Sequence, residues 1–198
     1  FREDIADYTG EALAAVAFLR GRTEVDPERI GLWGISQAGW VIAGAASRDP
    51  RIAFAVLVSC CAEPTSEQDR TRIRHTLRAN GFPDDAIRAA IETTDRLRSA
   101  AALGKELEAV DGVGPDVEKE AWWKLAYVGA SLRQVFGLLQ ALPERSYDPA
   151  EDLGKMACRA LVVMGGKDEA CPIEVNRPLF EAAFARARAE IKPIFLSI

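Results

Sequence analysis

A short apolar run that turns sharply into a helix of small residues constrains the fold of this chain most. The run from Ile30 to Ile35 carries no charge and follows the turn signal Asp26-Pro27. Such a run, bounded by turns, is typical of a buried parallel strand. Alanine and glycine then dominate from Gln37 to about Ser47, which predicts a helix packed closely against its neighbours. A strand joined directly to such a helix indicates an α/β fold.

Three further segments resemble buried strands, and helical patterns accompany them. The strand candidates run from Ile52 to Val58, from Ala160 to Met164 and from Pro193 to Ile198. An amphipathic helix from Ile5 to Leu19 precedes the first strand, and another from about Ile173 to Ala189 precedes the last. Parallel strands need long crossover connections, usually helices. The order therefore predicts an α/β protein with a parallel sheet flanked by helices.

The middle of the chain has a different pattern. From about Glu63 to Tyr147 we find charged helical patterns and no convincing strand. We therefore expect three parts: a first core part at 1–62, an inserted helical cap at 63–150, and a second core part at 151–198. Trp122 and Trp123 in the cap have two interpretations, which are packing in the cap's own core and roofing a substrate pocket.

Charge and hydrophobicity exclude some partners. The net charge of -5 argues against nucleic-acid binding, which needs a basic surface. The arginine-rich run 70–78 is flanked by acidic residues, which predicts a solvated helix face. No apolar run approaches the ~20 residues needed to cross a bilayer. We expect no nucleic acid and no membrane span, and the oligomeric state stays open.

The four cysteines show no recognisable framework. Cys60, Cys61, Cys158 and Cys171 have neither metal-site spacing nor a secreted disulfide pattern, and the adjacent pair is poorly placed to bridge. We expect buried, reduced thiols in a cytoplasmic protein and no metal. For Cys60 and Cys61, lining a pocket is the alternative to core packing. The chain opens on Phe1 within a helical pattern, so we expect its N-terminus to be missing, which leaves a signal peptide open.

Ser36 stands where the first strand turns into the helix, which is the context of a nucleophile elbow. The turn is tight, so the residues two before and two after the serine must be small, and Gly34 and Ala38 meet that demand. Gly39 lets the helix approach the sheet. The backbone N–H of Gln37 would face an oxyanion at the helix N-terminus. The alternative is a serine that merely caps the helix or contacts a phosphate.

The segment from Val25 to Trp40 resembles the elbow of bacterial α/β-hydrolases of the dienelactone hydrolase and prolyl-oligopeptidase-like group. That group includes carboxylesterases and acyl-CoA thioesterases. The match continues through the second strand and resumes from Arg159 to Pro172, whereas Ala38 stands where the family has glycine. The resemblance implies a partial α/β-hydrolase fold with an inserted helical cap. It also implies a serine hydrolase that cleaves a small-molecule ester or thioester through an acyl-enzyme on Ser36, without metal or cofactor.

A nucleophilic serine needs a base, and the base needs an orienting carboxylate. Asp168, in the loop after the third strand, looks like the family's triad acid; Glu169 is the second candidate, and a plain surface aspartate is the alternative. The chain's one histidine, His75, precedes this acid, whereas the family order is Ser, acid, His. The resemblance therefore implies a catalytic histidine beyond Ile198 and a second oxyanion donor before Phe1. We expect this chain alone to hydrolyse esters weakly or not at all.

Two other functions stay open from the sequence. The prolyl-oligopeptidase-like resemblance keeps a serine peptidase for short peptides as the first alternative. A non-catalytic binding module with a hydrolase fold is the second, and the absence of a histidine in the loop after Ile198 would favour it.

Overall fold

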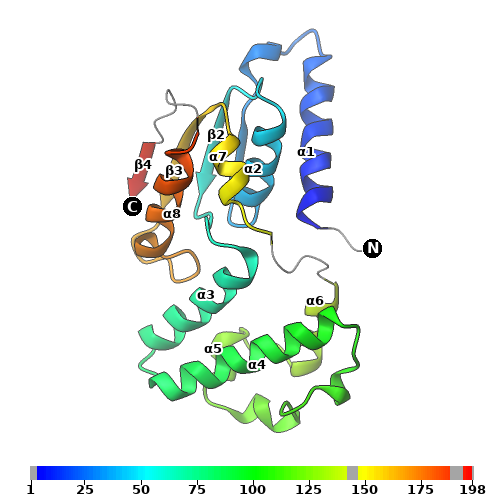
Figure 1. Ribbon diagram of the computed structural model, residues 1–198, viewed down its shortest axis with the longest axis vertical. Helices are drawn as coiled ribbons and strands as arrows, with labels where there is room; N and C mark the ends of the chain where they lie inside the picture. Colours follow the sequence, from blue (N-terminus) through cyan, green and yellow to red (C-terminus); the bar gives the residue numbers. More distant parts are fainter. Residues whose placement is uncertain (1–3, 142–146, 188–193, 198) are drawn as a thin grey trace. The chain divides into compact units, whose positions relative to one another are not determined.

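The computed structural model describes residues 4–141, 147–187 and 194–197. The described residues form two compact units (Figure 1). The sheet unit holds residues 4–68, 147–187 and 194–197, and the helical unit holds residues 69–141. Each unit has a hydrophobic core of its own, so each is described by itself.

The sheet unit contains a parallel sheet, as the sequence predicts. The order along the sheet is β1 (Leu32–Ile35), β2 (Phe54–Val58), β3 (Arg159–Met164) and β4 (Ile194–Ser197), and each strand pairs in parallel with the next. β1 and β2 begin later than predicted, although the N–H of Ala53 still donates to the carbonyl of Ile30 at 2.8 Å. Residues 193 and 198 of the predicted last strand lie outside the described residues.

Helices alternate with the strands and flank the sheet. The helices of this unit are α1 (Ile5–Arg20), α2 (Ala38–Arg48), α7 (Ala150–Lys155) and α8 (Ile173–Phe184), with a 3-10 turn η1 (Pro27–Arg29) before β1. α2, α7 and α8 share one core cluster with the sheet, and α1 packs on α2 (Figure 1). Since side chains alternate along a strand, Ala55 and Leu57 of β2 point into this core, as do Ala160 and Val162 of β3.

Several apolar side chains on the opposite face of the strands are exposed. Trp33 and Ile35 of β1 are 65% and 52% exposed, and Phe54, Ile194 and Leu196 are exposed as well. The prediction of a fully buried first strand is therefore wrong. Only one face of this strand packs into the core. Among the described residues, nothing covers the other face.

The helical unit contains most of α3 (Thr65–Ala79), with α4 (Asp84–Ala102), α5 (Trp123–Ala126) and α6 (Leu132–Ala141). Two 3-10 segments, η2 (Leu107–Ala109) and η3 (Pro115–Lys119), lie between α4 and α5, and its described residues hold no strand. Trp122 and Trp123 are 3% and 2% exposed and belong to the unit's own core.

The arginines of α3 form ion pairs instead of a simply solvated face. Arg72 contacts Asp69 at 2.8 Å, and Arg98 of α4 contacts the same carboxylate at 2.5 Å. Arg70 contacts Asp95 at 3.0 Å. The side chain of Arg72 is only 25% exposed, so the solvated-face prediction is wrong for this part of the run. None of the helices in the described residues is long and apolar enough to cross a membrane.

Candidate active site

Ser36 follows β1 directly and has a left-handed backbone, with φ of 56°. Its N–H donates to the carbonyl of Val58 on β2 at 3.0 Å, and its own carbonyl accepts from the N–H of Gly39 at 3.0 Å. A residue other than glycine in this region is strained by about 1–2 kcal/mol. Strain of this kind collects at functional sites, where surrounding structure holds it in place. The Ser36 side chain is exposed at the start of α2.

Two glycines make the sharp turn around Ser36 sterically feasible. A Cβ on Gly34 would lie 2.5 Å from the Cβ of Ala38 and 3.1 Å from Cδ1 of Ile42. A Cβ on Gly39 would overlap the Cβ of Cys60, the second residue after β2. Real Cβ atoms do not approach so closely, so α2 reaches the sheet only because these positions lack side chains.

We expect Gly39→Ala to lower the free energy of unfolding by about 2 kcal/mol, since the added methyl group forces Cys60 or α2 to shift. Gly10→Ala is the matched control. Gly10 lies on α1 and a Cβ there would have no neighbour within 4 Å, so its replacement should stabilise the helix by about 0.5–1 kcal/mol. Urea unfolding of both variants measures the difference. Equal effects would contradict the close approach of α2 to Cys60.

Gln37 is the N-cap residue of α2, and its side chain makes no capping hydrogen bond. The first N–H groups of a helix have no intrahelical acceptor. They point outward with the positive end of the helix dipole, so they can stabilise an anion at this point. Gln37 follows Ser36 directly at this helix end, so its backbone N–H is the candidate oxyanion donor.

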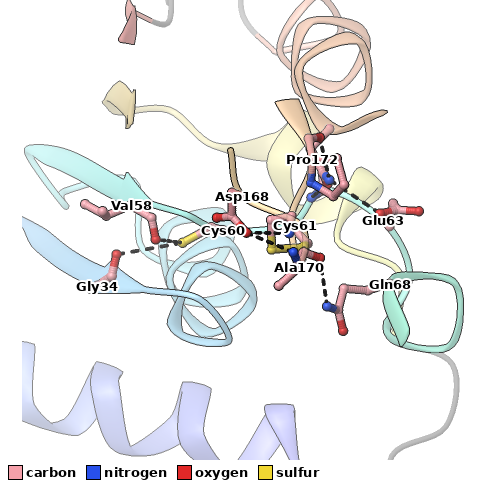
Figure 2. Close-up of a disulfide and its surroundings, with 12 residues drawn as sticks. Gly34, Val58, Cys60, Cys61, Glu63, Gln68, Asp168, Ala170 and Pro172 are labelled. Carbon is pink, nitrogen blue, oxygen red and sulfur yellow. Dashed lines mark hydrogen bonds between the residues drawn. A yellow bond between two sulfur atoms is a disulfide. The ribbon is translucent and has the colours of Figure 1, made fainter. Parts of the chain in front are cut away.

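Asp168 lies in the loop after β3, and its carboxylate is held firmly. Oδ1 accepts from the N–H of Ala170 at 3.0 Å and from the N–H of Cys171 at 2.9 Å (Figure 2). Its own N–H donates to the carbonyl of Gly165 at 3.3 Å. Among the described residues, no hydrogen bond is assigned to Oδ2. Glu169 is exposed and is not held in this way, so Asp168 is the carboxylate with a fixed orientation.

Ser36 and Asp168 lie at the same edge of the sheet. The Ser36 N–H bonds to Val58 at the end of β2, and the Ser59 N–H bonds to Val163 near the end of β3. The carboxyl ends of the three strands are therefore level. β2 lies between β1 and β3, so these two strands are about 10 Å apart, which is two inter-strand spacings.

His75 is not in this unit. It lies on α3 among the residues of the helical unit, whereas Ser36 and Asp168 belong to the sheet unit. Ser36, Gln37 and Asp168 therefore lie in one unit, and His75 belongs to the other.

Two of the four cysteines form a disulfide, so the prediction of four reduced thiols is wrong for them. Cys61 and Cys171 are bonded, with Cα atoms 5.4 Å apart, although 110 residues separate them in the chain. They meet because Cys61 follows β2 and Cys171 follows the adjacent β3. Cys60 and Cys158 are buried free thiols. No cluster of three or more His, Cys, Asp or Glu side chains that could hold a metal ion occurs in the part of the chain described.

A buried asparagine near the disulfide was missed from the sequence. Asn176, in the first turn of α8, is fully buried. Its Oδ1 accepts from the N–H of Ala62 at 2.8 Å, and its Nδ2 donates to the carbonyl of Pro172 at 3.2 Å and to Glu63 Oε2 at 3.4 Å. It joins the segment after β2 to the loop after β3. The available signal was an amide at a position facing the core, where a polar residue must be bonded.

Cys60 packs against Gly34 and Gly39, on either side of Ser36, as a neutral thiol. Its Sγ lies 3.2 Å from the carbonyl of Val58 and 3.7 Å from that of Gly34 (Figure 2). Burial raises the pKa of this thiol from its ordinary value of 9.0 to about 12. The packed-thiol interpretation therefore holds for Cys60, which is 0% exposed.

The raised pKa of the Cys60 thiol predicts a loss of stability at alkaline pH. Below pH 9 the thiol is protonated in both the folded and the unfolded chain, so it adds no pH dependence. Between about pH 9 and pH 12 the unfolded chain loses the proton and the folded chain keeps it. The free energy of unfolding should therefore fall by up to about 1.4 kcal/mol per pH unit. Urea unfolding of Cys60→Ala at pH 8, 9.5 and 10.5 should lack this contribution, and identical slopes for both proteins would contradict it.

No family model matches the chain. An uncharacterized 31.7 kDa protein in the traX-finO intergenic region of Escherichia coli is 26% identical over 180 residues, which are 88% of this chain and 58% of the relative. A thiohydrolase of Aspergillus aculeatus, aneE, is 42% identical over 55 residues, 28% of this chain and 17% of the relative. The chain thus spans little more than half of the E. coli relative's length.

Solved structures show the same architecture. An esterase of Pyrococcus furiosus superposes with a TM-score of 0.54 at 14% identity, and the match covers 96% of this chain and 51% of the esterase. At this identity the likeness concerns the fold alone, a parallel sheet flanked by helices.

Proposed function

This chain has the α/β-hydrolase fold, and from that premise we propose that its protein is a serine hydrolase that cleaves a carboxylic ester or thioester through an acyl-enzyme on Ser36. The left-handed Ser36 between β1 and α2 is the observation that carries the proposal. A serine that merely caps a helix would not need this strained backbone. In the nucleophile elbow the strain lifts the hydroxyl out of the turn.

In the proposed reaction Ser36 Oγ attacks the acyl carbon while a base removes its proton. The negative charge that develops on the acyl oxygen is stabilised by the N–H of Gln37. The alcohol or thiol then leaves with the proton. Water next attacks the acyl carbon while the base takes a proton from it, and Ser36 Oγ leaves with that proton as the acid is released. Asp168 orients the base through Oδ2, since Oδ1 is already bound to two N–H groups.

We propose that the base is a histidine in the loop after β4. An imidazole that bonds a serine on one side and a carboxylate on the other spans about 8 Å in total, with hydrogen bonds of about 2.8 Å. The lateral distance of about 10 Å between β1 and β3 leaves space for one such ring. The family resemblance indicates the same loop.

Two observations bear on the substrate. The similarity to the Aspergillus thiohydrolase supports a thioester, and the shared fold with the Pyrococcus esterase supports an oxygen ester. Both react by the same acyl-enzyme chemistry, and a thiolate is the better leaving group. We therefore keep both within one proposal.

The test compares three substrates on the full-length protein: p-nitrophenyl acetate, acetyl-CoA and an aminoacyl p-nitroanilide. Hydrolysis of the ester or the thioester, with fluorophosphonate labelling of Ser36, supports the proposal. Preference for the anilide would make the protein a peptidase instead. No hydrolysis and no labelling would contradict the proposal and favour a binding module.

A further inference from the structure

We propose that the Cys61–Cys171 disulfide is a clamp that positions Asp168, so that the hydrolase activity depends on the oxidation state of these two cysteines. The inference rests on the proposed function, because it concerns the acid of that same site. Cys61 and Cys171 are positioning residues in this proposal and do not touch the substrate.

The disulfide is attached to the residue that holds the carboxylate. The backbone N–H of Cys171 donates to Asp168 Oδ1 at 2.9 Å, and the N–H of Ala170 does so at 3.0 Å. Figure 2 shows Asp168, Ala170 and Cys61 grouped at this point of the loop. Any displacement of Cys171 therefore changes the position of the carboxylate through a direct hydrogen bond.

The other end of the clamp is anchored in the core. Cys61 follows β2 and is 4% exposed, as is Cys171. The bonded pair packs with Ile5 and Trp40 in one apolar cluster. Cys61 Sγ also lies 3.7 Å from the carbonyl of Ala170, a packing contact, since a disulfide sulfur carries no hydrogen. The bond thus joins the loop of Asp168 to the end of a central strand.

Two weaker links would remain after reduction, so the expected effect is graded. Gln68 Nε2 donates to the carbonyl of Ala170 at 3.0 Å, and Asn176 joins Pro172 to Ala62. These bonds keep the loop near its place. A shift of the carboxylate by a fraction of an ångström is enough to slow the reaction, since catalysis is sensitive to misplacement on this scale.

The free thiol next to the disulfide does not exchange with it. Thiolates attack disulfides and thiols do not, and Cys60 keeps its proton because burial raises its pKa to about 12. The clamp therefore needs an external reductant to open, and a dithiol such as dithiothreitol serves. The dithiol gives two electrons and two protons, becomes a cyclic disulfide, and leaves Cys61 and Cys171 as two thiols.

The experiment uses the full-length protein and p-nitrophenyl acetate. Wild type is assayed before reduction, after dithiothreitol treatment and removal of the reagent by desalting, and again after reoxidation. Removal is needed because thiolates cleave p-nitrophenyl acetate, and alkylation with mass spectrometry counts the free thiols. The double variant Cys61→Ala/Cys171→Ala removes the same disulfide by mutation. Cys158→Ala is the matched control, a buried cysteine of the same unit outside the disulfide. Circular dichroism at the assay temperature shows that each protein is folded.

We expect kcat to fall about tenfold in reduced wild type and in the double variant, with KM within about twofold. The acidic midpoint of the kcat/KM profile should move to lower pH, because a displaced carboxylate stabilises the imidazolium less. Reoxidation should restore wild type, dithiothreitol should not change the double variant further, and Cys158→Ala should resemble wild type.

Two results would overturn the inference and can be told apart by Asp168→Asn. If the reduced and double-variant proteins keep the wild-type kcat and pH profile while Asp168→Asn loses activity, the clamp is wrong and the proposed function stands. If Asp168→Asn also keeps full activity, Asp168 is not the acid of the proposed function. The inference that the disulfide acts through Asp168 is then wrong as well.

Discussion

Ser36→Ala is expected to lower kcat of the full-length protein by about 10⁶-fold and to abolish labelling by a fluorophosphonate. In the proposed reaction Oγ of Ser36 forms the acyl-enzyme, so its removal removes the nucleophile. Ser99→Ala is the control, since Ser99 is an exposed serine on α4. Labelling that persists in Ser36→Ala, or that disappears in Ser99→Ala, would remove Ser36 from the proposed role.

Ser36→Gly separates the chemical role of this position from its strain. Both variants lack the hydroxyl, so both should be inactive. Glycine adopts a φ of 56° without the penalty that alanine suffers, so Ser36→Gly should be more stable than Ser36→Ala by about 1 kcal/mol. Thermal unfolding of the two variants measures the difference. Equal melting temperatures would mean that the elbow is not strained in solution.

The elbow could be predicted from the sequence because its constraints are local. The requirement for small residues at Gly34 and Ala38 follows from a turn of five residues, and the structure places these two positions in contact range. The parallel sheet was also predictable, since the helices between its strands are long enough for crossovers. The strand starts were less predictable: the run from Ile30 is apolar throughout, yet regular pairing begins at Leu32.

Features that depend on distant segments could not be predicted. The exposure of Trp33 and Ile35 depends on which segments cover that face of the sheet, and an apolar run carries no information about that. The Cys61–Cys171 bond depends on β2 and β3 being neighbours although 110 residues separate the two cysteines. The cysteine spacing therefore predicted four reduced thiols, although Cys61 and Cys171 are bonded. Asp168 became the candidate acid only through its loop motif.

Asp168→Asn is expected to lower kcat by about 10⁴-fold while leaving the loop intact. The asparagine Oδ1 can still accept from the N–H groups of Ala170 and Cys171, so the fold should lose no more than about 1 kcal/mol from the weaker, uncharged acceptor. The amide would present an N–H group where the base needs an acceptor. The histidine would then settle in the wrong tautomer, as when the orienting aspartate of a serine-protease triad is replaced.

Glu169→Gln is the matched control, because it removes one carboxylate from the adjacent position of the same loop. Since Glu169 is exposed and Asp168 is held by two N–H groups, we expect Glu169→Gln to keep wild-type kcat. Steady-state assays with p-nitrophenyl acetate, together with melting temperatures, distinguish the cases. A loss in Glu169→Gln with full activity in Asp168→Asn would transfer the acid to Glu169. Two N–H bonds to one carboxylate oxygen would then have only a structural role, which is to shape the loop that ends at Cys171.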